Sequence, residues 1–151
     1  MPTGFFVGNE LDFATRKARG RLELDPTDLL THGLIVGMTG SGKTGLGVVL
    51  IEECLAAGLP TLLIDPKGDL GNLCLTFPNL GAADFRPWIN DGDAQKAGVT
   101  PDEFAAQQAT TWTDGLAGWG IGPDRIAALR QSIGLTIYTP GSTSGVPLNI
   151  G

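Results

Sequence analysis

The chain has 151 residues, 42% of them hydrophobic, which suits a single globular domain and excludes a disordered chain. Ten basic and sixteen acidic side chains give a net charge of −6, which argues against nonspecific binding to nucleic acid or to an anionic membrane. No secretory leader is visible in the first twelve residues, and no apolar run approaches the ~18 residues of a membrane span. We therefore expect a cytoplasmic protein without a membrane segment.

The first part of the chain, residues 1–31, is predicted to be a β-rich lead-in to a main domain that spans residues 32–151. Short β-like pieces lie at 4–8 and 21–24, and the Asp-Pro-Thr-Asp run at 25–28 ends the lead-in with a turn.

A strand, a helix and a second strand are predicted at the start of the main domain. The apolar runs at 33–37 and 61–64 are typical of buried parallel strands, because they are too short for helices and are bounded by Gly or Pro. The helix between them should run from about Gly42 to Ala57 and end at Gly58, and its few charges predict cover on most sides. This order predicts a right-handed βαβ unit.

The later elements are predicted with less regular patterns. We expect a short helix at 70–77 and a loop at 79–98 in which Phe85 and Trp88 are packed. A capping box predicts a helix from Thr100 to about Gly118. A helix at 123–132, a strand at 136–138 and a turn at 140–147 follow.

In the predicted helix at 100–118, Phe104, Trp112 and Leu116 fall on one face, because they are spaced at multiples of four. Trp88, Trp112 and Trp119 are expected to pack in the core rather than to stack on bases, because no basic residues alternate with them.

The pattern Gly-x-x-x-x-Gly-Lys-Thr at 37–44 matches a phosphate-binding P-loop. Glycine lets the backbone curl around phosphate oxygens, and the helix that follows adds its positive end and unpaired N–H groups. Lys43 is predicted to contact the phosphates and the transition state, and Thr44 to ligate Mg²⁺. The predicted nucleotide-binding residues are Gly37, Met38, Thr39, Gly40, Ser41, Gly42, Lys43, Thr44 and Gly45.

The expected ligand is Mg-ATP, because the chain has no Asn-Lys-x-Asp segment of the kind that reads guanine. Asp65, at the end of the second predicted strand, is a further candidate for the magnesium side of the site. A purely structural turn at Asp65-Pro66-Lys67-Gly68-Asp69 is an equally open interpretation.

The run from Thr31 to Thr44, followed by the run from Leu63 to Leu70, resembles the HerA/FtsK class of P-loop ATPases, which includes the bacterial HerA-like ATP-binding proteins and the helicase HerA central domain. The segment Tyr138–Ser142 is also similar to that group. The resemblance implies a RecA-like parallel sheet flanked by helices, assembly into a ring, and action on DNA. Family members are longer and carry their Walker B acid, sensor and arginine finger after this region. The chain therefore resembles the N-terminal part of such a domain, with hydrolysis expected of the full-length protein.

Two other functions stay open from the residues. A small P-loop kinase would need an arginine-rich lid, for which Arg125 and Arg130 are the available side chains. A non-catalytic module would use the nucleotide only as a stabilising ligand.

Overall fold

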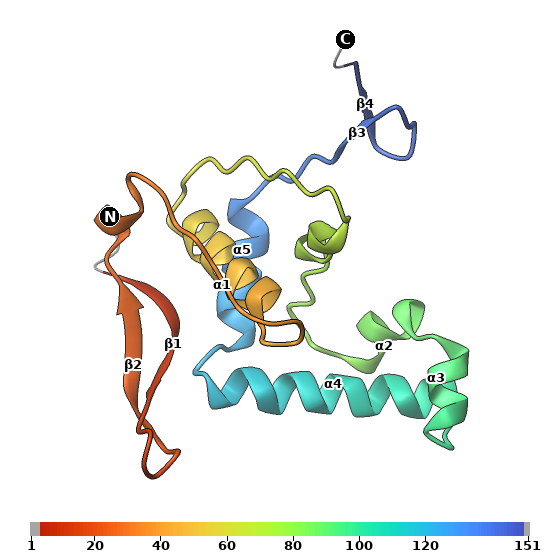
Figure 1. Ribbon diagram of the computed structural model, residues 1–151. Helices are drawn as coiled ribbons and strands as arrows, with labels where there is room; N and C mark the ends of the chain where they lie inside the picture. Colours follow the sequence, from red (N-terminus) through yellow and green to blue (C-terminus); the bar gives the residue numbers. More distant parts are fainter. Residues whose placement is uncertain (1–3, 150–151) are drawn as a thin grey trace. The chain divides into compact units, whose positions relative to one another are not determined.

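The computed structural model describes residues 4–149 (Figure 1). These residues form two compact units, which we describe separately. The first combines the chain up to Leu75 with the segment from Ser132 onward, and the second is Thr76–Gln131. The boundary at residue 31 that the sequence suggests stays a prediction.

The first unit opens with an antiparallel hairpin of β1 (Phe5–Leu11) and β2 (Ala18–Leu24), visible as the red and orange strands of Figure 1. This confirms the β-like pieces at 4–8 and 21–24. The hairpin packs against α1 (Lys43–Ala56) through β1, where Phe5 is buried and the Phe6 N–H donates to Glu53 Oε2 at 3.2 Å. A short 3₁₀ helix, η1 (Pro26–Leu29), follows, capped by the Asp25 side chain.

Helix α1 confirms the predicted helix and its end. Gly58 has a φ of +75°, and the Leu59 N–H bonds back to the Cys54 carbonyl at 3.0 Å, which is the hydrogen bond of a Schellman cap. The predicted cover on most sides is wrong, because no residue of α1 is fully buried. The segments that flank the helix do not form the strands that would have covered it.

The predicted strands at 33–37 and 61–64 are not formed, and both segments are extended without ladder partners among residues 4–149. A strand needs a neighbour for its backbone N–H and C=O groups, and an apolar run does not supply one. Leu34 and Leu62 are consequently 86% and 87% exposed.

Two further elements belong to the first unit. The predicted helix at 70–77 is present as a 3₁₀ helix, η2 (Asp69–Cys74). The strand predicted at 136–138 begins later, as β3 (Tyr138–Pro140), and pairs in parallel with β4 (Val146–Leu148), where a turn was predicted. The fold is therefore mixed α/β, and each sheet of the described chain has two strands.

The regular structure of the second unit is entirely helical among the described residues. It contains α2 (Ala82–Phe85), η3 (Arg86–Trp88), α3 (Asp91–Lys96), α4 (Pro101–Gly118) and all but the last residue of α5 (Pro123–Ser132). The loop predicted at 79–98 is wrong because its polar residues cap short helices. The Asp84 carboxylate accepts from the Gly81 N–H at 3.1 Å, and the Asn90 side chain accepts from the Gly92 N–H at 2.8 Å.

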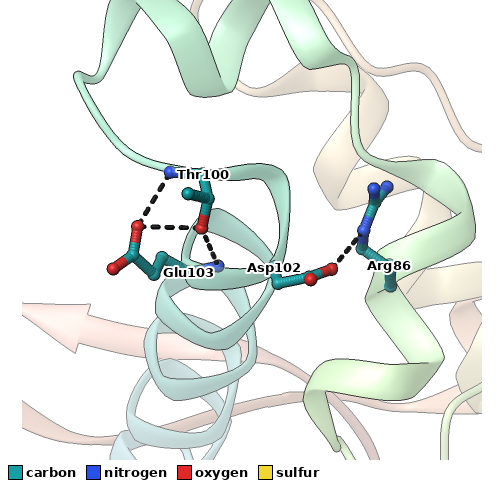
Figure 2. A network of polar contacts seen from close by, with 4 residues as sticks. All are labelled: Arg86, Thr100, Asp102 and Glu103. Carbon is teal, nitrogen blue, oxygen red and sulfur yellow. Dashed lines mark hydrogen bonds and ion pairs between the residues drawn. The ribbon is translucent and has the colours of Figure 1, made fainter.

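The start of α4 confirms the predicted capping box (Figure 2). Thr100 Oγ1 accepts from the Glu103 N–H at 3.2 Å, and Glu103 Oε2 accepts from the Thr100 N–H at 2.8 Å. Arg86 Nε donates to Asp102 Oδ1 at 2.6 Å, which joins η3 to the first turn of α4. The two contacts fix where α4 begins.

The core of the second unit is centred on Phe85, which packs against Ala105 and Ala109 of α4. Phe77 meets Phe85 edge to face, with ring centroids 5.2 Å apart. Phe85 is therefore packed as predicted. The buried positions of α4 are two alanines that allow close approach of α2, whereas Phe104 and Leu116 are only half-buried.

The three tryptophans are not in the core, contrary to the prediction. Trp88, Trp112 and Trp119 are 62%, 53% and 46% exposed. The short helices of the second unit enclose the smaller side chains of Phe85, Ala94, Ala105 and Ala109, and a core of that size leaves the indole rings at the surface.

Candidate functional site

The segment from Gly37 to Thr44 turns sharply into helix α1. The Ser41 N–H bonds to the Met38 carbonyl at 3.2 Å, and Gly40 and Gly42 have φ values of +77° and +87°. Side chains with a Cβ resist that conformation, so these two glycines allow the turn. Gly42 is also the residue that caps α1.

Gly37 leaves room for a neighbouring side chain. A Cβ at residue 37 would overlap the Ser41 hydroxyl oxygen, so a side chain at this position would force the Ser41 side chain to move. The four fixed positions of the motif thus lie in one continuous turn, with Lys43 and Thr44 as the first two residues of the helix.

The Lys43 side chain folds back over the loop. Its Nζ donates to the Met38 carbonyl at 2.6 Å, so the ammonium group lies on the same curve of backbone that the glycines form. The ammonium is the one cation in the stretch from 37 to 45, and α1 has no acidic residue in its first turn. An anion placed here meets positive charge, with no carboxylate in the loop or in the first turn of α1.

The N-terminus of α1 adds hydrogen-bond donors to this positive charge. The first intrahelical bond runs from the Leu46 N–H to the Gly42 carbonyl at 2.9 Å. The N–H groups of Lys43, Thr44 and Gly45 precede that bond, and the helix dipole favours negative charge beside them. Thr44 is exposed in the same turn, with its hydroxyl available to a cation.

Asp65 organises the turn before η2. Its Oδ1 accepts from the Gly68 N–H at 2.9 Å and its Oδ2 from the Leu70 N–H at 2.8 Å. The hydrogen bond from Leu70, together with those from its neighbours, holds the pKa of the Asp65 carboxyl below its usual value of 3.8. Asp65 therefore has a structural role in this turn, and its assignment to a metal stays a prediction.

Arg130, a candidate for an arginine-rich lid, makes a structural contact in the second unit. Its guanidinium donates to the Thr76 carbonyl at 2.8 Å and so ties α5 to the segment before α2. No cluster of three or more His, Cys, Asp and Glu side chains able to hold a metal ion occurs in residues 4–149. Among the helices described, none combines the length and the apolar character that crossing a bilayer requires.

A family model described as "Helicase HerA, central domain" matches residues 12–103. The match contains the loop at 37–44, the whole of α1 and Asp65, and it spans more than half of the chain. The chain belongs to the helicase HerA central-domain family. Comparisons with curated proteins and with solved structures give no match.

Membership in the HerA family indicates a function of the ATPase or helicase type. Within the matched range, the loop at 37–45 is where an unpaired helix N-terminus, a lysine and a hydroxyl coincide. These groups form the candidate functional site of this HerA-family chain.

Proposed function

We propose that this HerA-family chain binds Mg-ATP through residues 37–45 and serves as the nucleotide-binding part of an ATPase. The observation that carries the proposal is the geometry of the loop. Two left-handed glycines, Gly40 and Gly42, curl the backbone in front of a helix whose first turn has no acidic residue.

Each group in the loop has a different proposed role in binding Mg-ATP. The N–H groups of the loop and of the first turn of α1 donate to phosphate oxygens, and the Lys43 ammonium moves from the Met38 carbonyl to the terminal phosphates. The Thr44 hydroxyl would be a ligand of Mg²⁺, and the ion, when bound, would supply charge neutralisation at the phosphates. Asp65 is proposed as a second-sphere acid, reaching the metal through water.

The wider biological setting of the proposal follows from the HerA family. In a ring of such subunits, the ATPase would act on DNA in the cytoplasm. The apolar segments 33–37 and 61–64 support a RecA-like parallel sheet there, because strand neighbours would cover side chains such as Leu34 and Leu62. A test is amide exchange at 33–37 and 61–64, which should slow on assembly and stay fast in the monomer.

Calorimetric titration of the chain with ATP and MgCl₂ tests the nucleotide proposal. Binding should be measurable for the unaltered chain and lost in Lys43→Ala, while Lys96→Ala, which removes an exposed cation of α3, should bind as before. GTP should bind more weakly than ATP. Equal binding by the two lysine variants would show that the loop at 37–45 is not the site.

A further inference from the structure

The tip of the β1–β2 hairpin concentrates positive charge in an acidic chain. Residues 12–21 hold four of the ten basic side chains, Arg16, Lys17, Arg19 and Arg21, and only one of the sixteen acidic ones, Asp12. Four cations within six positions form a cluster of positive charge, whereas the other basic residues are spread along the chain. The nucleotide site does not use it.

Asp12 is the residue that holds the tip in shape. Its carboxylate accepts from the Ala14 and Thr15 N–H groups at 2.9 and 2.8 Å and pairs with Arg19. Its N–H bonds to the Lys17 carbonyl at 2.9 Å, which closes the turn. The single acidic group of the tip is thereby fully engaged by the hairpin itself.

The remaining cations are divided between the strand and the turn. Arg21 lies over the Phe6 ring, 3.9 Å from its centroid, and pairs with Glu23. Arg16 and Lys17 are exposed in the turn, and no acidic side chain pairs with either among the ion pairs of residues 4–149. They are the two charges that the tip presents to a ligand.

An aromatic ring accompanies them. Phe13 is 89% exposed, the most exposed large hydrophobic side chain of the described chain, and it stands three residues before Arg16 in the same turn. A phenyl ring that is so exposed buries little apolar surface and therefore contributes little to the stability of the fold. An exposed aromatic ring in the same turn as two cations is the combination that stacks a base and neutralises adjacent phosphates.

We propose that the β1–β2 tip, formed by Phe13, Arg16 and Lys17, is a contact surface for single-stranded nucleic acid. An anionic membrane is the weaker match to the same groups, because one phenyl ring buries too little apolar surface for stable anchoring. Stacking needs no more than that ring. The inference rests on the proposed action on DNA, for which it names a contact surface outside the nucleotide site. It is tested without ATP, so its failure leaves the Mg-ATP proposal untouched.

The experiment is a fluorescence-anisotropy titration of labelled oligo(dT) and oligo(U), each of about 16 nucleotides, at several salt concentrations. Phe13→Ala should weaken binding about 5- to 150-fold, the range that one stacked base gives, and Phe13→Tyr should restore it. Arg16→Glu and Lys17→Glu should each weaken binding and reduce the salt slope by about 0.7, the share of one phosphate contact on a single strand.

The matched control is Lys96→Glu, which changes the net charge equally at an exposed site of α3. It should bind the oligonucleotides as the unaltered chain does. The proposal is overturned if the chain binds no oligonucleotide, if Lys96→Glu weakens binding as much as Lys17→Glu, or if phosphatidylserine vesicles bind through these three residues while oligonucleotides do not. Unequal affinity for oligo(dT) and oligo(U) would identify which nucleic acid the tip prefers, and either preference supports the proposal.

Discussion

At the scale of single residues, Thr44 is predicted to bind the Mg²⁺ ion, whereas Lys43 is predicted to bind the phosphates. If its hydroxyl ligates Mg²⁺, Thr44→Ala removes a metal ligand and leaves the phosphate cradle intact. ATP affinity in the presence of Mg²⁺ should then fall to the value that the unaltered chain shows with EDTA. Thr44→Ser, which keeps the hydroxyl, is the control. An Mg²⁺ effect that survives in Thr44→Ala would contradict the assignment.

Asp65 gives a prediction about pH. Because hydrogen bonds from Leu70 and its neighbours keep the pKa of Asp65 below 3.8 in the folded chain, its stabilising contribution is complete above 3.8 and is lost as the pH falls through the folded value. Asp65→Ala should therefore lower the midpoint of thermal unfolding at pH 7, and the gap to the unaltered chain should close in acid. If the two unfolding midpoints still differ well below pH 3.8, the ionised Asp65 carboxylate is not the source of the stabilisation.

The sharp turn into α1 was predictable from sequence because the signals for it are local. Eight consecutive residues, 37–44, encode its glycines and its lysine, and nucleotide binding by them stays a prediction. The basic tip of the hairpin was missed although its signal is in the sequence, as four cations in six positions at 16–21. Its meaning depends on the exposure of Phe13 and the pairing of Asp12 with Arg19, which are properties of the fold.

At the scale of elements, the capping box of α4 is open to a matched test. Thr100→Ala removes the acceptor for the Glu103 N–H and should lower the free energy of unfolding by about 1 kcal/mol. Thr111→Ala removes a hydroxyl that bonds to the Gln107 carbonyl within the helix, and it should be neutral or slightly stabilising. Chemical denaturation measures both. Equal losses would mean that the cap is not what stabilises the start of α4.

Helices with clear end signals were predictable, whereas strands were not. The Gly58 cap and the Thr100 box are encoded within a few residues, so α1 and α4 end and begin where the sequence indicates. The runs at 33–37 and 61–64 have the composition of strands, but pairing depends on distant segments that composition does not specify. The same limit explains why β3 pairs with β4 inside a predicted turn.

At the scale of the whole molecule, the two units have separate cores, with Phe5 buried in the first and Phe85 in the second. Phe85→Ala should cost the second unit about 3–5 kcal/mol. Amide exchange should then accelerate in α2, α3 and α4, while Mg-ATP binding by the first unit continues. Phe13→Ala, at the exposed tip, is the matched control and should leave exchange in both units unchanged. Equal acceleration in β1 and α1 would contradict the independence of the units.

Thermal unfolding with and without Mg-ATP tests most directly whether residues 37–45 bind the nucleotide. A ligand at a hundredfold excess over its dissociation constant adds about 2.7 kcal/mol, which corresponds to roughly 5–10 °C for a chain of this size. We predict that shift for the unaltered chain and for Lys96→Ala, and none for Lys43→Ala. An equal shift in Lys43→Ala, or no shift in the unaltered chain, would contradict the account.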